Sequence, residues 1–342
     1  MHSMSTQNTG RSCLANDLLA DLPLVVETTP PLPGRPSWLA AAASLLALSG
    51  WALSLRAGPV PVPNASFESP VTTYVDTRID SWQKTPKPSW YVESQPGEWD
   101  QLVGLFLNTP PNDPRHIDNC DGTQAIWLFA VPEAGLFQDY DSTDGTNTTP
   151  THAFDAKFEV GKSYELAVGV VRGEAPMAEG ATLEISLYYR DGASNQLTVA
   201  ATTITNTSTL FSNITHLVDF RVRVPTVQSG DAWAGQNIGV RLRSTIALEP
   251  TQWGGYWDLD NLRLTSFTEP VLRETTLTSG QFGFVLESEP GLRFEILAST
   301  NLALPSAGWA SLATVTNVTG SVPFTDPVVP SLPRFYRARA LP

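Results

Sequence analysis

The sequence predicts an all-β protein made of two antiparallel sandwiches, and three observations support this. Apolar and polar residues alternate with a period of two in several segments, such as 183–189 and 218–224, which is typical of strands with one buried face. Turn residues separate these segments, as at Arg190-Asp191-Gly192, and the chain holds 28 Pro and 24 Gly. Between residues 68 and 257 no segment has the apolar spacing of an amphipathic helix.

The composition suits such a protein and excludes some classes of function. Charged residues make up 16% of the chain, against about 25% in an average globular protein. The formal net charge is −13. Surfaces that bind nucleic acids or anionic membranes need basic patches, so we expect no nucleic-acid partner. The two cysteines, Cys13 and Cys120, lie on opposite sides of a hydrophobic segment, which argues against a disulfide between them.

That hydrophobic segment covers residues 38–55. It contains no charged residue and is flanked by Arg35 and Arg56. Its length lies between that of a secretory signal core and that of a short membrane span. We therefore predict that residues 1–57 are an N-terminal extension with a signal peptide or signal anchor. The protein would be secreted or held in the cell envelope, in contact with a membrane only through this segment. Two alternatives stay open: cleavage of this segment, and a true start codon further downstream.

Two short segments far apart in the chain predict how the first sandwich closes. After an extended, Pro-rich linker, Asn64-Ala65-Ser66-Phe67-Glu68 has the pattern of an opening strand, and Trp257–Leu264 that of a closing strand. The pair resembles the first and last strands of galactose-binding-like β-sandwiches, which include many carbohydrate-binding modules. The resemblance implies an antiparallel jelly roll over residues 58–267.

A second unit follows a short junction at residues 268–270. Short alternating segments and a Pro290-Gly291 turn predict a small immunoglobulin-like sandwich over residues 271–342. The stretches Gly291–Leu302 and Arg334–Ala338, with Trp309 between them, resemble a C-terminal module common in secreted proteins of Verrucomicrobia and related bacteria. That resemblance implies an exported bacterial protein of several domains.

The resemblance of the first unit also implies a structural calcium site where the two ends of the jelly roll meet. Glu68 and Asp260 match the family's ligand positions best, followed by Asn64 and Asp121. Calcium binds six to eight oxygen ligands, and two facing carboxylates without a cation would repel each other. The alternative is that Glu68 and Asp260 accept hydrogen bonds from backbone amides at strand ends.

Aromatic residues in predicted loops suggest a carbohydrate site, because sugar faces stack on aromatic rings. The candidate stacking residues are Trp90, Trp99, Trp233, Trp253 and Tyr256. The loop Trp253-Gly254-Gly255-Tyr256 is the best candidate for stacking on a sugar, since two glycines leave both rings projecting from an open loop. The alternative is that these rings plug the ends of the sandwich. Trp82 and Trp127 lie among apolar strand residues and are expected in the core.

Catalytic motifs are not evident in the sequence. No pair of carboxylates has the spacing used by jelly-roll glycosidases, Glu98 and Asp100 being the closest pair, and the four histidines have no metal-ligand spacing. We therefore predict that the protein is not an enzyme. The expected function is non-catalytic, low-affinity carbohydrate binding by the jelly roll, with a polysaccharide or glycan as partner. The alternatives are a structural or adhesive envelope protein without a small ligand and an uncharacterised glycoside hydrolase.

Overall fold

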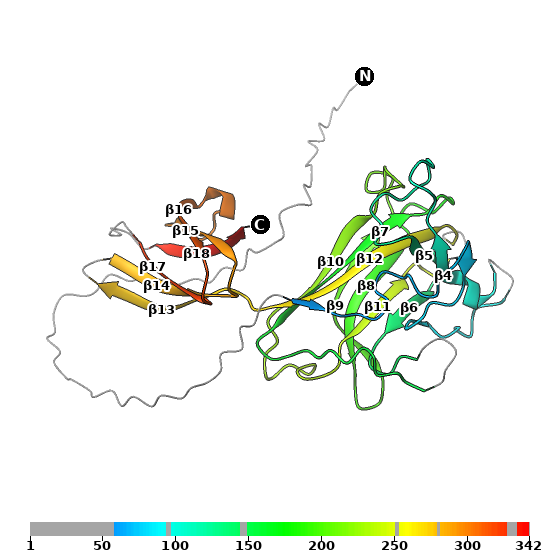
Figure 1. Cartoon of the computed structure of the whole chain (residues 1–342), viewed down its shortest axis with the longest axis horizontal. Helices are drawn as coiled ribbons and strands as arrows, with labels where there is room; N and C mark the ends of the chain where they lie inside the picture. The colour runs from blue at the N-terminus through cyan, green and yellow to red at the C-terminus, as the bar shows by residue number, and fades with distance from the viewer. Residues whose placement is uncertain are drawn as a thin grey trace, which may run out of the picture. The chain divides into compact units, whose positions relative to one another are not determined.

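The structure, a computed structural model, describes residues 58–93, 97–143, 149–249, 253–278, 281–326 and 334–341. The hydrophobic segment 38–55 lies outside these residues. Within the described ranges, no helix is long and apolar enough to cross a membrane. The chain divides into two compact units, with Glu269 the last residue of one and Pro270 the start of the other. Figure 1 traces both units, which are described one at a time.

The first unit is a sandwich of two antiparallel sheets, as predicted. One sheet has the order β10 (Val218–Val224), β7 (Ser163–Arg172), β12 (Tyr256–Phe267), β5 (Gln124–Phe129), β4 (Val103–Leu107) and β2 (Val75–Asp76), and β1 (Gly58–Val60) also pairs with β12. The other has the order β3 (Gln83–Lys84), β6 (Gly135–Gln138), β11 (Gly239–Ser244), β8 (Thr182–Arg190) and β9 (Gln196–Thr205). A short 3-10 helix, η1 (Trp99–Leu102), precedes β4.

Alternation along the strands sends one set of side chains into the space between the sheets. Leu128 on β5, Leu259 on β12, Ile185 on β8 and Val240 on β11 are fully buried in one hydrophobic cluster. The residues between them on β5 and β12 point to the opposite face of the first sheet, because side chains alternate along a strand. That opposite face carries the site described below.

The closing strand β12 changes phase in the middle. Its apolar positions run Trp257, Leu259, Leu262 and Leu264, so a spacing of three interrupts the spacing of two. A β-bulge absorbs the extra residue: the pairing with β7 shifts between Asp260 and Arg263, and Asn261 has a φ of 56°. The bulge keeps all four apolar side chains buried.

The predicted opening strand is wrong. Residues 64–68 form a turn and an irregular segment, and the first strand is instead β1, within the expected linker. Asn64 and Phe67 have φ values of 51° and 54°, which a strand does not allow. The Asn64 side chain holds the turn by donating hydrogen bonds to the Ser69 and Asp80 carbonyls and by accepting one from the Ser69 amide.

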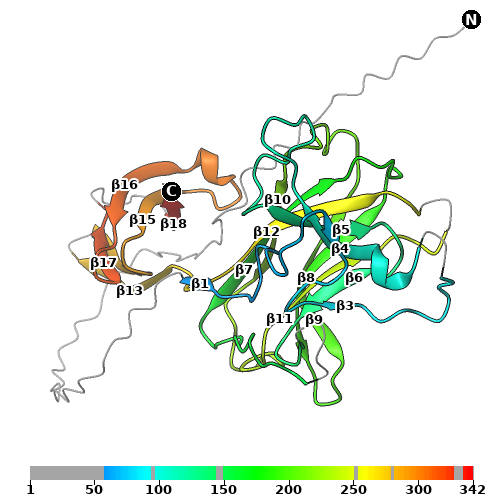
Figure 2. The same cartoon turned by 45° about the vertical axis from the view of Figure 1, so that its right-hand side comes forward.

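The second unit is a small sandwich of two three-stranded antiparallel sheets (Figure 2). Their orders are β13 (Val271–Thr278), β14 (Gln281–Glu287), β17 (Ser321–Thr325) and β16 (Ala310–Thr316), β15 (Arg293–Ser299), β18 (Phe335–Leu341). Phe284 and Leu286 from one sheet pack with Phe294, Ile296 and Tyr336 from the other. The predicted all-β fold class, with a sandwich in each unit, is confirmed.

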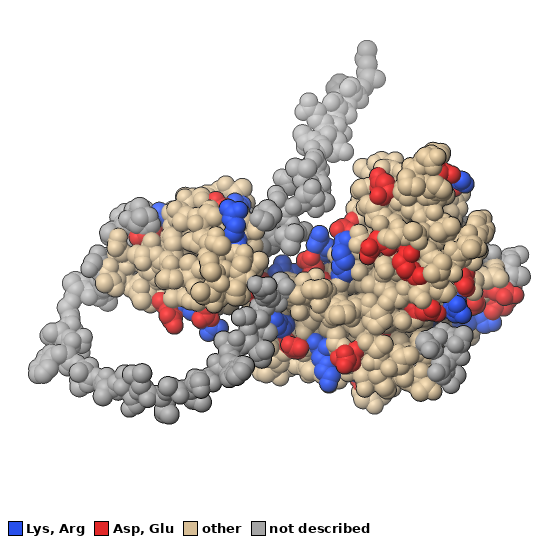
Figure 3. Space-filling model, in the orientation of Figure 1, with Lys and Arg blue, Asp and Glu red and all other residues tan. Residues whose placement is uncertain are grey.

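Charges are interspersed over the visible face of the first sandwich. Figure 3 shows acidic and basic side chains side by side there, without a broad basic patch on that face. Ion pairs of the first sandwich include Arg263 with Asp219 at 2.7 Å and Arg241 with Glu184 at 3.0 Å. The net charge of −13 is therefore not gathered into a single acidic surface on this side.

Candidate functional site

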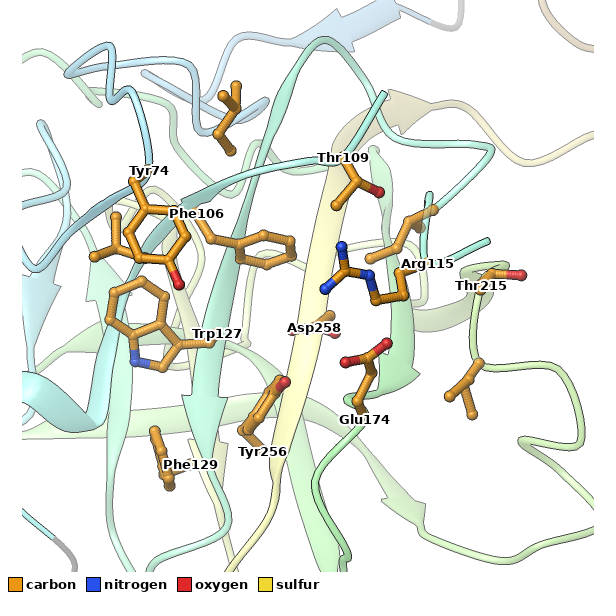
Figure 4. Close-up of a pocket in the computed structure, with 14 residues that line it drawn as sticks. Tyr74, Phe106, Thr109, Arg115, Trp127, Phe129, Glu174, Thr215, Tyr256 and Asp258 are labelled. Carbon is orange, nitrogen blue, oxygen red and sulfur yellow. The ribbon is translucent and has the colours of Figure 1, made fainter. Parts of the chain in front are cut away.

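A cavity of about 410 Å³ lies against the face of the first sheet that points away from the second sheet (Figure 4). Strands β2, β4, β5 and β12 supply its floor and one wall. Two loops cover it, residues 108–119 between β4 and β5 and residues 207–217 between β9 and β10; we call these loops the roof. The lining residues are Tyr74, Val75, Phe106, Leu107, Thr109, Arg115, Ile117, Trp127, Phe129, Glu174, Ile214, Thr215, Tyr256 and Asp258.

One wall of the cavity is aromatic. Trp127 and Phe129 are two residues apart on β5, so both project from the same face, and Tyr256 on β12 lies opposite Phe129 in the strand register. The Phe129 and Tyr256 ring centroids are 5.7 Å apart. The Trp127 indole is anchored because its Nε1 donates a hydrogen bond to the Gln101 carbonyl at 3.0 Å. Figure 4 shows Tyr74 and Phe106 completing this wall.

Two glycines leave room for the rings. A Cβ at Gly104, the β4 residue paired with Trp127, would lie 2.4 Å from the indole ring. A Cβ at Gly173 would lie 2.0 Å from the Tyr256 ring. Real Cβ atoms do not approach other atoms that closely, so both rings lie in space that only glycine leaves open.

Hydrogen bonds join the two loops of the roof to each other. Asn119 in one loop and the Leu217 backbone in the other exchange two hydrogen bonds, of 2.9 and 2.8 Å. The Asp118 amide donates to the Thr215 carbonyl at 3.1 Å. Within the first loop, Asn108 exchanges two side-chain hydrogen bonds with the Ile117 backbone. The roof is therefore held by bonds that do not involve the side chains lining the cavity.

Asp258 is the acidic group of the cavity floor. It lies on β12 directly opposite Trp127 on β5, and its side chain is buried with the residue only 7% exposed. Among the described residues no hydrogen-bond partner is found for its Oδ1 atom. Burial, with a smaller effect from the nearby Glu174 carboxylate, raises the pKa of Asp258 well above the usual 3.8. Burial therefore favours the protonated form of this carboxyl group.

Charged residues lie at the opposite wall. Arg115, in the roof, donates from Nε and Nη2 to the two carboxylate oxygens of Asp113, at 3.0 and 2.9 Å. Glu174 follows β7 and is exposed, close enough to Arg115 to raise the pKa of that guanidinium further, after the larger effect of Asp113. Figure 4 shows the guanidinium extending over the cavity, with Glu174 and Thr215 on the same side.

Most of the predicted stacking residues lie elsewhere. Tyr256 lines the cavity, but Trp253 packs on Trp90 at 5.4 Å, and Trp90 and Tyr91 each meet Trp99 nearly edge-on, at 88° and 68°. The three Trp indole nitrogens donate to Glu133, Thr85 and Ala247. This cluster matches the alternative of rings packed at one end of the sandwich. Trp233 packs separately against the core.

The predicted calcium ligands come together only in part. Glu68 and Asp260 both reach the loop 121–124, as expected from the two ends of the sandwich. Glu68 accepts hydrogen bonds from the Thr123 and Gln124 amides and from the Thr123 hydroxyl, and Asp260 accepts one from the Asp121 amide at 2.6 Å. Asp121 itself is exposed, and Asn64 holds its own turn.

No group of three or more His, Cys, Asp or Glu in the described ranges is placed to hold a metal ion. Asp260 Oδ1 is nevertheless buried without a hydrogen-bond partner among those residues. Burial is the largest cause that raises the pKa of Asp260 to about 7. The calcium site stays a prediction.

The sequence reasoning missed Asp258, Glu174, Arg115, Phe106 and the role of Trp127. Trp127 was expected in the core because its neighbours are apolar, yet alternation places it on the other face from Ile126 and Leu128. A signal was present in β12: Tyr256 and Asp258 are two residues apart and must share a face. The roof residues carry no comparable local signal.

Comparison with known proteins identifies a family that the first sandwich matches. Residues 58–265 match the family named HpiC1-like, described as HpiC1 cyclase. A Stig cyclase, Fisc, from Fischerella sp. TAU, solved with (3Z)-3-(1-methyl-2-pyrrolidinylidene)-3H-indole, is 18% identical and covers 62% of this chain and 98% of its own, with a TM-score of 0.43. A search among curated proteins found no match.

Two further solved structures are similar to the same part of the fold. A cyclase from Fischerella sp. TAU in complex with 4-(1H-indol-3-yl)butan-2-one is 18% identical and covers 63% of this chain and 100% of its own, with a TM-score of 0.43. The CBM22-1 xylan-binding domain of Xyn10C from Paenibacillus barcinonensis is 13% identical and covers 54% and 84%, with a TM-score of 0.29.

The match to a cyclase family corrects the predicted function. The predictions of a non-catalytic carbohydrate-binding protein and of no enzyme activity were both wrong, because the matched family is one of enzymes and its match covers residues 58–265 of the first sandwich. The jelly-roll resemblance stands. The resemblance of the second unit to a Verrucomicrobia-type module has no support, since the family match ends at residue 265.

Proposed function

The chain belongs to the HpiC1-like cyclase family over residues 58–265, and from this premise we propose that its first sandwich closes a ring in an apolar, unsaturated substrate by acid catalysis at Asp258. The observation that carries the proposal is a buried carboxyl group on the floor of an aromatic cavity, with one oxygen that has no hydrogen-bond partner among the described residues. An apolar site favours the protonated form of a carboxyl group, and that form is a proton donor.

The proposed step begins when the Asp258 carboxyl group gives its proton to one carbon of a substrate double bond. The π electrons form the new C–H bond, which leaves a carbocation on the substrate and a carboxylate on Asp258. A second double bond of the same molecule then supplies its electrons to the cation and forms the ring-closing C–C bond. Loss of a proton from the cyclised cation regenerates the acid. The product is an isomer of the substrate, and no co-reactant is consumed.

The aromatic wall suits this intermediate. The negative face of an aromatic ring attracts a cation, by about 2 kcal/mol where water is excluded. Trp127 lies directly across from Asp258 in the strand register. The ring type that attracts cations most strongly therefore flanks the acid. The wall contains no amine, thiol or hydroxyl that is activated to attack the cation: its polar groups are the Trp127 indole N–H, which is bonded to Gln101, and the Tyr74 and Tyr256 phenols.

The test uses Asp258→Asn, which keeps the size of the side chain and removes the acid. Wild-type protein and the variant are incubated with a panel of aromatic compounds that carry alkenyl chains. Products are detected by liquid chromatography with mass spectrometry as isomers of unchanged mass. General acid catalysis contributes a factor of about 100 or more, so the variant should lose at least that much of kcat.

A matched control separates the acid from a general effect of charge. Asp141→Asn removes an exposed carboxylate outside the cavity and should leave kcat unchanged. If Asp258→Asn cyclises as fast as wild type, Asp258 is not the acid. If wild type cyclises no compound of the panel, the substrate class is wrong.

Export of the protein is a separate part of this proposal. Export through residues 38–55 is supported by the uncharged hydrophobic run between two arginines. Fractionation of cells that express the full chain tests the proposal: export predicts protein outside the cytosol, and deletion of residues 38–55 should return it there.

A further inference from the structure

The cavity has two chemically different walls. Figure 4 shows the aromatic rings of Tyr74, Phe106 and Trp127 on one side and Thr109, Arg115, Glu174 and Thr215 on the other, with Asp258 between the two sets. The second wall is polar, and a uniformly apolar substrate would leave its buried hydroxyl, the Thr109 Oγ1 atom, without a hydrogen-bond partner.

Two polar atoms on that second wall lack partners. The Thr109 Oγ1 atom is buried and has no hydrogen-bond partner among the described residues. Arg115 uses Nε and Nη2 on Asp113, and for its Nη1 no hydrogen bond to a described residue is found. Both residues line the cavity. Donors that are held in place and unused by the protein are what a bound acceptor group requires.

The charges beside Arg115 specify which acceptor fits. Its positive charge is matched by the bidentate Asp113 carboxylate at 2.9 Å, and the Glu174 carboxylate adds a second negative charge close by. The three groups together sum to one net negative charge. An anionic head group would be repelled, whereas a neutral acceptor takes the free N–H without adding charge.

We propose that Arg115 is a specificity-determining residue that donates a hydrogen bond to a neutral, hydrogen-bond-accepting head group of the substrate. The unsaturated body of the substrate then lies on the aromatic wall, with its reacting double bond over Asp258. This inference rests on the proposed cyclase function and adds the substrate class: an apolar, unsaturated molecule with one neutral acceptor at its end.

Replacement of Arg115 should leave the roof and the cavity in place. Residues 108–119 are held by the Asn108 and Asn119 hydrogen bonds and by the Asp118 amide, none of which uses the Arg115 side chain. Arg115→Met keeps the length of the apolar stem and removes the donors, while Arg115→Lys keeps a positive charge and a donor.

The experiment measures binding of three naphthalene probes, whose fluorescence is separable from that of tryptophan. They are 4-(naphthalen-2-yl)butan-2-one with a ketone, 2-butylnaphthalene without an acceptor, and 3-(naphthalen-2-yl)propanoate with a negative charge. Wild type should bind the ketone at least about tenfold more tightly than the hydrocarbon, because a hydrogen bond to a charged donor is worth that much. The carboxylate should bind more weakly than the ketone.

The variants assign the preference to Arg115. Arg115→Met should bring the ketone affinity to within about twofold of the hydrocarbon affinity and leave the hydrocarbon affinity unchanged, and Arg115→Lys should recover part of the preference. Asp258→Asn should keep the preference, and so should Arg273→Ala, which removes an exposed arginine of the second unit.

The outcomes separate the two proposals. If the ketone preference survives in Arg115→Met, or is lost in Asp258→Asn instead, the head group does not bind at Arg115. If the carboxylate binds most tightly, the acceptor is not neutral. If the hydrocarbon binds wild type but no probe shows a preference, the inference fails while the apolar cavity of the proposed function remains. If no probe binds, both are wrong.

Discussion

Asp258 and Trp127 lie directly opposite each other on neighbouring strands β12 and β5, on the face of the sheet turned away from the core. Directly opposed residues in an antiparallel pair have their Cβ atoms about 5 Å apart. The register therefore places a buried acid beside the largest aromatic ring of the cavity. This relationship depends on backbone hydrogen bonds and not on a mobile loop, so the geometry of acid and ring is fixed before any substrate binds.

The two glycines under the aromatic wall should be intolerant of any side chain. Gly104→Ala and Gly173→Ala each place a methyl group within 2.4 Å of the Trp127 or Tyr256 ring, which must then move. We expect each variant to lose about 1–3 kcal/mol of unfolding free energy, the usual cost of overpacking, and to bind the hydrocarbon probe more weakly. Urea denaturation and probe titration measure both effects.

Other glycines provide the control for this prediction. Gly192→Ala and Gly230→Ala add the same methyl group where no other atom lies within 4 Å. Both should keep wild-type stability to within about 0.5 kcal/mol and wild-type probe affinity. Equal losses in all four variants would mean that the effect comes from the backbone and not from the rings.

The pKa of Asp258 sets a pH dependence with a definite sign. The folded protein holds the Asp258 proton to a higher pH than the unfolded chain, because burial, then Glu174, raises this pKa. The folded state therefore binds more protons above pH 4, and its stability falls as the pH rises toward the folded pKa. Asp258→Asn cannot titrate, so its melting temperature should fall less than that of wild type between pH 5 and 9.

Activity should follow the same group. Because the protonated form is the catalyst, kcat/KM should decline on the alkaline side with the pKa of the free enzyme's Asp258. A rate that rises with pH, as a carboxylate base requires, would contradict the assignment. Burial is also the main cause that raises the pKa of Asp260 to about 7. This group therefore adds a second decrease of stability with rising pH, which Asp260→Asn should remove.

The calcium prediction is decided by melting temperature. Asp260 Oδ1 is buried without a partner among the described residues, and Glu68 and Asp121 are close enough to affect the pKa of Asp260. A cation that binds only the folded state stabilises it by RT ln(1 + [L]/Kd). We expect 1 mM calcium to raise the melting temperature relative to chelator, more so above pH 7, where Asp260 is ionised.

Asp260→Asn should abolish that increase, and Asp141→Asn, which alters a carboxylate exposed away from this loop, should keep it. If calcium and chelator give equal melting temperatures in a sample free of bound metal, the hydrogen bonds from the Thr123, Gln124 and Asp121 amides are the whole role of these carboxylates.

The strands were predictable because alternation is local. The segments 183–189 and 218–224 became β8 and β10 almost to the residue. The site was not predictable in the same way. Arg115 reaches the cavity because two loops 98 residues apart in sequence are joined through Asn119 and Leu217. No local pattern encodes that contact.

Two errors came from assigning a role to a residue from its neighbours. The motif at Asn64–Glu68 predicts a strand, although Asn favours left-handed turns, and Asn64 forms one here. The loop tryptophans do gather, but Trp99 meets Trp90 edge-on and Trp253 packs on Trp90 at a tilt. Their indole nitrogens are bonded within the protein, so these rings match the alternative of aromatic packing at one end of the sandwich.

Trp127 should matter for the rate more than for binding. Trp127→Leu keeps an apolar wall but removes the ring face that stabilises the carbocation, which is present only after proton transfer. An interaction made only with the intermediate lowers kcat when it is lost and leaves KM little changed. A loss of about 2 kcal/mol corresponds to a roughly 30-fold lower kcat.

Trp127→Phe is the matched variant, because it keeps a smaller ring on β5 and loses only the hydrogen bond to the Gln101 carbonyl and part of the ring face. It should retain most of kcat, between wild type and Trp127→Leu. Steady-state kinetics on a compound that wild type cyclises gives both constants. If KM rises 30-fold and kcat stays constant, the ring binds the ground state and the cation is stabilised elsewhere.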